Sequence, residues 1–120
     1  MFPKKNRVSK KEINQIFKDG FFINSNNLVF KFLKNEKELN SKISFIVGKN
    51  ISKKAVIRNK IRRLGYQTFK NYQKSLPFSL MGVFIFSRNS LGFLEKPKKE
   101  QEKKLQKEFE VILNKINKKT

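Results

Sequence analysis

The residues of this chain best suited to chemistry form one basic segment, residues 49–63, with the sequence KNISKKAVIRNKIRR. It contains no acidic residue. At about 100° per residue on a helix, Arg58 and Arg62 fall on one flank of the apolar stripe. Lys60 and Arg63 fall on the other flank. Two guanidinium groups four residues apart can point in one direction and bridge neighbouring phosphates. The segment therefore predicts a helical surface that binds a sugar-phosphate backbone.

Neighbouring groups strengthen this prediction. Asn59 adds a hydrogen-bond donor and acceptor, and Lys53 and Lys54 precede the helix as supporting cations. The N-terminal amides and the positive end of a helix dipole also favour phosphate. A run of charge on a helix is usually only a solvated face, but here no acidic partner accompanies the cations. Binding is the favoured interpretation.

The types of residue that are missing exclude most protein-based catalysis. The chain has no Cys and no His, which removes disulfides, thiolate chemistry, imidazole bases and the usual zinc sites. Asp19 is the only aspartate, and six of the eight Glu lie in residues 36–38 and 100–110 among lysines. Because a protein-held catalytic metal usually needs convergent carboxylates, we predict no catalytic and no metal-ligating residues.

The sequence predicts a single RNA-binding domain spanning residues 1–120, with flexible basic tails at 1–8 and 117–120. The net charge of +20 opposes compaction and favours a polyanionic partner, of which nucleic acid is the commonest. The longest apolar run, residues 80–86, is too short to span a membrane. The N-terminus lacks the apolar core of a secretion signal, so we expect a cytoplasmic protein.

The elements that must position these residues begin with a short helix over residues 10–19. Ser9 and Glu12 fit a capping box, and Gly20 stands where a left-handed stop falls. Strands are predicted at residues 21–23 and 28–33, and a third at residues 43–48. We expect the second and third strands to form an antiparallel hairpin with an exposed, mobile tip.

Helical spacing extends from Lys53 to Lys74 and predicts the second helix. Residues 78–87 predict a buried central strand, and residues 88–96 a loop before Pro97 opens a final helix. That helix carries one apolar stripe: Leu105, Phe109, Ile112, Leu113 and Ile116. The predicted fold class is α/β (α+β), a two-layer sandwich of order α-β-β-β-α-β-α, with helices packed on a mixed, mostly antiparallel four-stranded sheet.

Residues 47–63, VGKNISKKAVIRNKIRR, resemble the signature helix of the bacterial ribonuclease P protein family. Residues 6–8 and 13–20 resemble the basic opening and first helix of that family, and Arg88 after the buried strand also fits. The family pattern Arg-Asn-Arg is Arg58-Asn59-Lys60 here, so that one planar guanidinium is replaced by an ammonium.

The resemblance implies a protein subunit that binds a catalytic RNA, one protein per RNA, and holds the single-stranded 5′ leader of precursor tRNA. The RNA, with Mg²⁺ bound mainly by RNA and substrate, would remove the leader; no organic cofactor is implied. The residues implied in RNA binding are Lys53, Lys54, Arg58, Asn59, Lys60, Arg62, Arg63 and Arg88. Those implied in the leader cleft are Phe17, Lys31 and Ile13. Ile13 and Lys31 replace residues that are often aromatic in the family, so base stacking there rests mainly on Phe17.

Two other classes of function remain open at this stage. A ribosomal or other structural RNA-binding protein has the same size, charge and mixture of elements, and only residues 58–63 favour the processing subunit over it. An autonomous protein nuclease is disfavoured by the shortage of carboxylates. For Phe17 itself, a place in the hydrophobic core is as compatible with the pattern as base stacking.

Overall fold

The protein is described by a computed structural model at residues 7–35, 41–76, 78–87 and 96–119. Within these ranges the order of helices and strands is α-β-β-β-α-β-α, which confirms the predicted fold class. The elements are α1 Lys10–Asp19, β1 Phe21–Asn24, β2 Leu28–Lys34, β3 Lys42–Ile46, α2 Ala55–Phe69, the 3₁₀ turn η2 Gln73–Ser75, β4 Leu80–Phe86 and α3 Lys98–Lys119. The predicted hairpin tip at residues 36–40 lies outside the described residues.

The four strands form one mixed sheet in the order β1-β2-β4-β3. β1 pairs with β2 and β2 with β4 in antiparallel fashion, whereas β3 pairs with β4 in parallel. The predicted antiparallel hairpin of the second and third strands is therefore wrong, because β4 lies between them. The chain passes through α2 on its way from β3 to β4, and such a crossover places its two strands parallel and adjacent.

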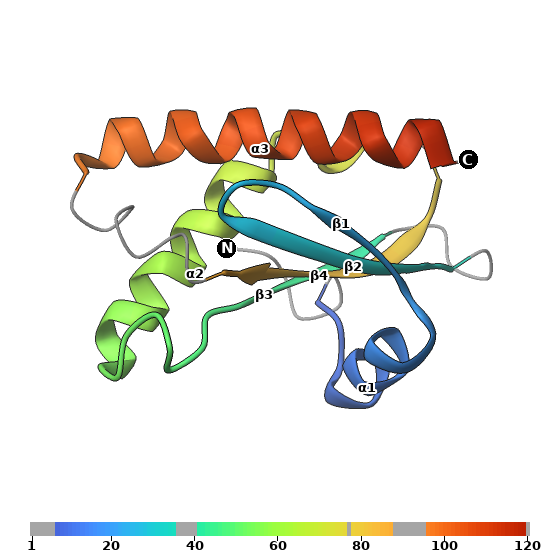
Figure 1. Cartoon of the computed structure of the whole chain (residues 1–120), viewed down its shortest axis with the longest axis horizontal. Helices are drawn as coiled ribbons and strands as arrows, with labels where there is room; N and C mark the ends of the chain where they lie inside the picture. Colours follow the sequence, from blue (N-terminus) through green and yellow to red (C-terminus); the bar gives the residue numbers. More distant parts are fainter. Residues whose placement is uncertain (1–6, 36–40, 77, 88–95, 120) are drawn as a thin grey trace.

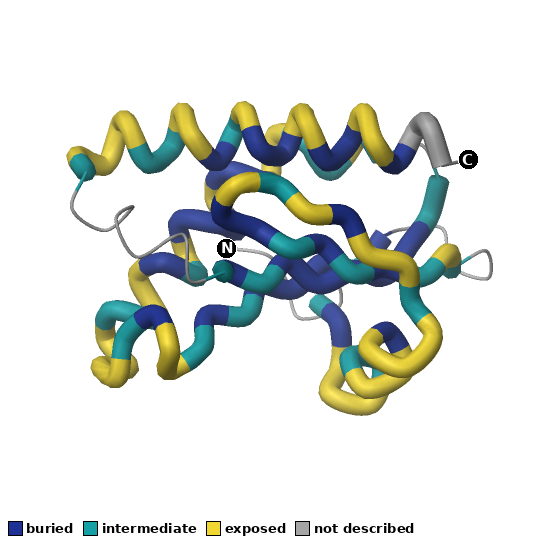
Figure 2. The backbone as a smooth tube through the Cα atoms, in the orientation of Figure 1, coloured by how far each residue is buried: buried dark blue, intermediate teal, exposed yellow. Residues whose placement is uncertain are grey.

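α2 and α3 cover one face of the sheet, and α1 lies against the other (Figure 1). On the first face, Phe84 of β4 stacks on Phe30 of β2 and Phe45 of β3, with ring centroids 4.3 and 4.9 Å apart. Phe109 of α3 meets Phe84 edge-on at 5.1 Å. The apolar stripe predicted for the last helix is confirmed, since all its residues are buried and its polar side faces solvent (Figure 2).

The second face of the sheet carries a smaller cluster made by Val8, Ile16 of α1, and Met81 and Val83 of β4. Val8 belongs to the segment predicted as a tail, yet it is buried, and its N–H donates to Ser44 Oγ at 2.8 Å. The packed domain therefore starts before α1, and the chain just after residue 6 crosses the sheet.

The capping box predicted at the start of α1 is confirmed. The N–H of Glu12 donates to Ser9 Oγ at 3.2 Å, and the N–H of Ser9 donates to Glu12 Oε1 at 2.9 Å. Gly20 does not adopt the predicted left-handed conformation, since its φ is −78°. Glycine is needed there for space: a Cβ would collide with the carbonyl oxygen of Ile16 and lie 3.0 Å from that of Phe32.

α2 is shorter than the predicted helix 53–74, because it ends at Phe69. The chain then tightens: the N–H of Tyr72 donates to the carbonyl oxygen of Phe69 at 2.8 Å, and η2 follows. This turn places the Tyr72 ring 5.8 Å from that of Phe109. Tyr72, which was predicted on the apolar side of a longer helix, thus reaches the core through a 3₁₀ turn.

A buried carboxylate ties α3 to the turn between β1 and β2. Glu108 is 6% exposed, and its carboxylate accepts hydrogen bonds from Ser25 Oγ at 2.6 Å and Asn27 Nδ2 at 2.9 Å. The backbone N–H of Asn27 donates to it as well. A buried charge is tolerated when hydrogen bonds surround it, so this contact fixes where α3 crosses the sheet.

Candidate nucleic-acid interface

α2 holds its basic side chains outward because its opposite side is packed into the core. Its buried residues are Ile61, Leu64, Gly65, Tyr66, Thr68 and Phe69. At Gly65 a Cβ would lie 2.6 Å from Cδ2 of Phe45, so glycine lets the helix lie close to β3. Asn59, Lys60 and Arg63 are exposed as a consequence, and Arg58 and Arg62 are half-buried.

Arg58 and Arg62 lie on one flank of α2 but have different partners. Nη1 of Arg58 donates to the carbonyl oxygens of Ser52 and Lys53, both at 2.9 Å, and so closes the loop before the helix. Nη1 of Arg62 donates to Asn59 Oδ1 at 2.8 Å. The two guanidinium groups are therefore not a matched pair. Arg58 holds the start of the helix, whereas Arg62 lines a pocket together with Arg7 of the N-terminal segment.

A concave site, which we call the arginine pocket, lies between that segment and α2. It has a volume of about 200 Å³ and is lined by Arg7, Asn59, Arg62, Arg63 and Tyr66. The guanidinium of Arg7 lies 5.2 Å from the centroid of the Tyr66 ring, a cation–π contact. Nε of Arg7 is buried without a hydrogen-bond partner among the described residues. Three guanidinium groups thus converge where an anion would satisfy them.

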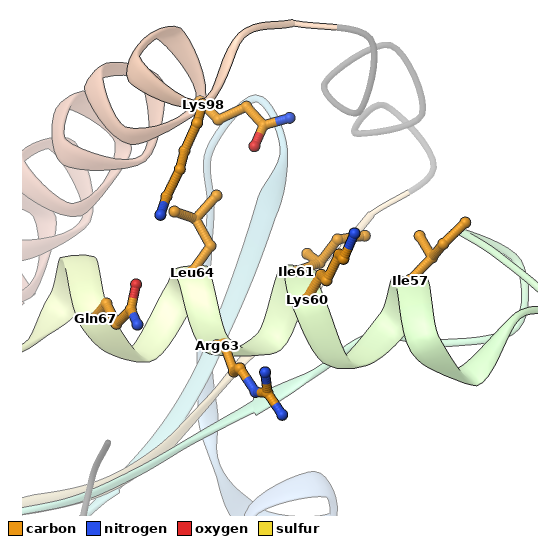
Figure 3. Close-up of a pocket in the computed structure, with 8 residues that line it drawn as sticks. Ile57, Lys60, Ile61, Arg63, Leu64, Gln67 and Lys98 are labelled. Atoms are coloured by element: carbon orange, nitrogen blue, oxygen red, sulfur yellow. The ribbon is translucent and has the colours of Figure 1, made fainter.

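A second hollow, which we call the α2–α3 groove, lies on the other flank of α2 (Figure 3). It has a volume of about 640 Å³. Its lining residues are Ile57, Lys60, Ile61, Arg63, Leu64, Gln67, Lys98 and Gln101. Lys60 borders only the groove and Arg62 only the arginine pocket, on the flanks predicted for them, whereas Arg63 borders both hollows and Arg58 borders neither.

Phe17, Lys31 and Phe22 form an aromatic patch on the sheet face that carries α1. Phe17 is 47% exposed and Phe22 57% exposed. Nζ of Lys31 lies 4.9 Å from the centroid of the Phe17 ring, and Phe22 of β1 pairs directly with Lys31 of β2. Exposed aromatic rings beside a cation are suited to stacking bases.

The aromatic patch and the arginine pocket lie at opposite ends of one row across the sheet. Lys31 pairs with Val83, and Val83 pairs with Ser44. Ser44 binds Val8, the residue next to Arg7. Three strand spacings of about 4.8 Å separate Phe22 from Ser44, which is about 14 Å in all. Val83 and Ser44, in the middle of this row, are buried beneath Val8 and α1. A strand that contacts both ends would therefore pass over this cover and not along the sheet itself.

The other predicted site residues lie near these two regions, in the core or outside the described residues. Lys53 and Lys54 are exposed just before α2. Ile13 is half-buried and packs against the small cluster under α1, so it supports the helix that carries Phe17. Arg88 lies outside the described residues.

Sequence reasoning missed several residues that border the two hollows or the aromatic patch, among them Arg7, Phe22, Tyr66, Gln67, Lys98 and Gln101. Arg7 belongs to the basic opening of the chain, which was a usable signal. Phe22 could have been found from the alternation of β1, where the next residue, Ile23, is buried. Lys98 and Gln101 carried no signal, because only packing brings α3 beside α2.

The carboxylate of Glu12, in the first turn of α1, serves the fold. Burial alone would raise the pKa of Glu12, but hydrogen bonds from Ser9 and the Nζ of Lys42, 3.3 Å away, outweigh it and lower the pKa below its usual value of 4.5. In the described part of the chain no group of three His, Cys, Asp or Glu is placed to hold a metal ion. Among the helices described there, none is both long and apolar enough to cross a membrane.

Comparison with known proteins places the chain in a family. The family model described as Ribonuclease P matches residues 2–117. The chain therefore belongs to the ribonuclease P protein family, whose functions are RNA binding and tRNA processing. No curated protein sequence gives a significant match.

Solved structures share the fold. The RNase P protein from Thermotoga maritima is 22% identical, with 92% of this chain and 96% of that chain covered and a TM-score of 0.79. The RNase P protein from Staphylococcus aureus is 22% identical, with 91% and 93% covered and a TM-score of 0.71.

Proposed function

We propose that this chain is the protein subunit of a ribonuclease P ribonucleoprotein in the cytoplasm, with one protein per catalytic RNA. It binds that RNA and the 5′ leader of precursor tRNA, and it assists Mg²⁺-dependent removal of the leader. The RNA subunit carries out the hydrolysis. The observation that carries this proposal is the convergence of Arg7, Arg62 and Arg63 at one end of a sheet face whose other end bears exposed aromatic rings.

The contributions of the two ends follow from their chemistry. Guanidinium groups neutralise phosphates and release counterions, which supplies affinity without sequence preference. Aromatic rings stack on bases of any identity. A leader that differs from one precursor tRNA to the next needs this kind of tolerant binding. The protein thereby raises the local order of a flexible substrate strand and reduces phosphate repulsion around the scissile bond.

The exposed ridge of α2 is the proposed contact with the catalytic RNA. Lys60 and Arg63 face away from the sheet, and Lys53 and Lys54 extend the positive surface beyond the start of the helix. Arg58 stabilises that start through the carbonyl oxygens it binds. The described residues offer no carboxylate cluster for a metal, so the proposal assigns Mg²⁺ to RNA and substrate.

Reconstitution tests the proposal directly. Precursor tRNA is incubated at low Mg²⁺ with the organism's catalytic RNA alone, with this protein alone, and with both. We expect correct 5′ maturation only when both are present. Cleavage by the protein alone would indicate an autonomous nuclease. A protein that binds RNA but leaves cleavage unchanged would instead be a structural RNA-binding protein.

A matched variant links the outcome to the site. Arg7→Gln with Arg62→Gln removes two charges from the arginine pocket, and Lys103→Gln with Lys107→Gln removes two from the outer face of α3. The first pair is expected to raise the Km for precursor tRNA with a long leader while leaving that for a leaderless or single-nucleotide leader substrate little changed. The second pair should affect both substrates slightly and equally.

A further inference from the structure

The α2–α3 groove has the composition of a ligand site and has no part in the leader path described above. Its volume of about 640 Å³ falls within the range of about 300–1,000 Å³ typical of small-molecule pockets. Ile57, Ile61 and Leu64 form its apolar floor, and Lys60, Arg63 and Lys98 stand around it. Figure 3 shows Lys98 reaching down from α3 toward Leu64.

This combination selects one kind of occupant. The apolar floor suits a flat, uncharged ring system, and no described acidic side chain lines the groove, so that three cations there favour an anion. Gln67 carries an amide with both a donor and an acceptor, the groups that read the edge of a base. The amide of Gln101 already donates through Nε2 to the carbonyl oxygen of Lys96 at 3.0 Å. A nucleotide combines these features: a flat ring system, polar ring edges and a negative charge.

We infer that the α2–α3 groove binds one unpaired nucleotide of the RNA partner, with the base on the floor of Ile57, Ile61 and Leu64 and the phosphate beside Lys60, Arg63 or Lys98. This inference rests on the proposed function. It adds to that function a base-binding site that is separate from the aromatic patch and lies on the flank of α2 opposite the arginine pocket.

Arg63 is the reason for assigning the nucleotide to RNA and not to a free metabolite. It borders both the arginine pocket and the groove, so Arg63 stands on the exposed ridge of α2, the surface proposed to contact the catalytic RNA. A polynucleotide strand that follows this surface has its phosphates near Arg63 and one base beside the groove. A free nucleotide would gain nothing from that surface.

The test uses RNA hairpins that differ at a single position: one bulged adenosine, an abasic bulge, or no bulge. Binding of each hairpin to the full chain is measured by anisotropy. Ile57→Ser takes apolar area from the floor, and Val56→Ser is its control, since Val56 is the neighbouring residue, is 68% exposed and lies outside the groove. Thermal unfolding shows that each variant is folded.

The wild-type protein and Val56→Ser are expected to bind the bulged adenosine at least about five-fold more tightly than the abasic bulge, the ratio for about 1 kcal/mol of base binding. Ile57→Ser should reduce this ratio to below about two-fold while leaving affinity for the fully paired hairpin unchanged. Lys98→Gln should lower the affinity for the bulged hairpin most, whereas Lys103→Gln, on the outer face of α3, should lower the affinity for all three hairpins to the same small extent.

Three other results would overturn the inference, and each differs from failure of the proposed function. One is a wild-type protein that binds all three hairpins equally. Another is an adenosine preference that survives Ile57→Ser. The third is competition by free AMP at concentrations similar to the Kd of the bulged hairpin. That result would make the groove a site for a free nucleotide. Failure of the proposed function would instead appear as a protein that leaves precursor-tRNA cleavage unchanged.

Discussion

α2 and α3 are both rich in cations and pack on the same face of the sheet, but their charges are arranged differently. α3 mixes its lysines with Glu100, Glu102, Glu108 and Glu110, whereas α2 contains no acidic residue. α3 carries one fully buried apolar stripe. α2 borders the arginine pocket on one side and the α2–α3 groove on the other. The helix whose lysines are mixed with glutamates, α3, mainly stabilises the fold. The helix whose cations have no acidic neighbours, α2, carries the candidate binding surface.

The comparison has a physical basis. Neighbouring opposite charges on a helix screen each other and add a few tenths of a kcal/mol per pair, so a mixed face interacts weakly with a distant polyanion. Like charges on one helix repel until a polyanion arrives, so the same repulsion that weakens α2 in isolation strengthens its complex. Variants of the two helices should therefore separate stability from binding.

The largest effect is expected from Phe109→Ala in α3. Phe109 is fully buried among Phe45, Phe69 and Phe84, and its removal should lower the free energy of unfolding by about 3–5 kcal/mol. Urea denaturation measures this as a lower midpoint. Val111→Ala, on the exposed side of the same helix, should change stability by less than about 0.5 kcal/mol. Equal losses for the two would show that α3 does not anchor the core.

Glu108→Gln should have the next largest effect on stability. In Gln an NH₂ group replaces one of the two carboxylate oxygens that accept hydrogen bonds from Asn27. One buried N–H then lacks an acceptor, which should lower the free energy of unfolding by about 1–3 kcal/mol. The matched control is Glu100→Gln, which is exposed in the first turn of α3. If the two variants unfold at the same urea concentration, Glu108 does not tie α3 to the β1–β2 turn.

Arg62→Ala combined with Arg63→Ala should weaken RNA binding at least about tenfold without a loss of stability. Loss of two phosphate contacts on a single strand should also flatten the slope of log affinity against log salt by about 1.4. Lys103→Ala with Lys107→Ala removes the same charge from α3. A similar change of slope for the α3 pair would mean that net charge, and not its placement on α2, determines affinity.

The smallest effect concerns Glu12 and pH. Its pKa is lower in the folded chain than its usual value of 4.5, because hydrogen bonds from Ser9 and Lys42 outweigh the opposite effect of burial. The stability it contributes is therefore present above pH 4.5 and is lost as pH falls through the lowered pKa. The difference in Tm between wild type and Glu12→Gln should shrink over that range. A difference that stays constant with pH would exclude this contribution.

Local features of the fold could be predicted from the sequence because their causes are local. The capping box of Ser9 and Glu12 specifies where α1 starts, and the spacing of Leu105, Phe109 and Ile112 specifies the buried side of α3. Features that depend on partners were predicted wrongly. The place of β3 depends on the crossover through α2, and the extended conformation of Gly20 depends on its approach to β2.

The candidate site divides in the same way. The cations of α2 could be identified because they follow one another in the chain and lack acidic neighbours. Arg7 joins Arg62 only because Val8 binds Ser44 and draws the N-terminal segment across the sheet. The contact between Lys31 and Phe17 likewise requires α1 to lie over β2. These are contacts between distant residues, which no local pattern encodes.

The sequence by itself determined the order of the elements, the charge of +20 and the helix that displays it, since periodicity and composition follow from neighbouring residues. Only the tertiary structure decided that β4 lies between β2 and β3, that two hollows flank α2, and that aromatic rings and arginines end one row across the sheet. The reason is that sheet order and surface shape arise from packing between distant segments, where burial of the whole core outweighs the preference of any one part.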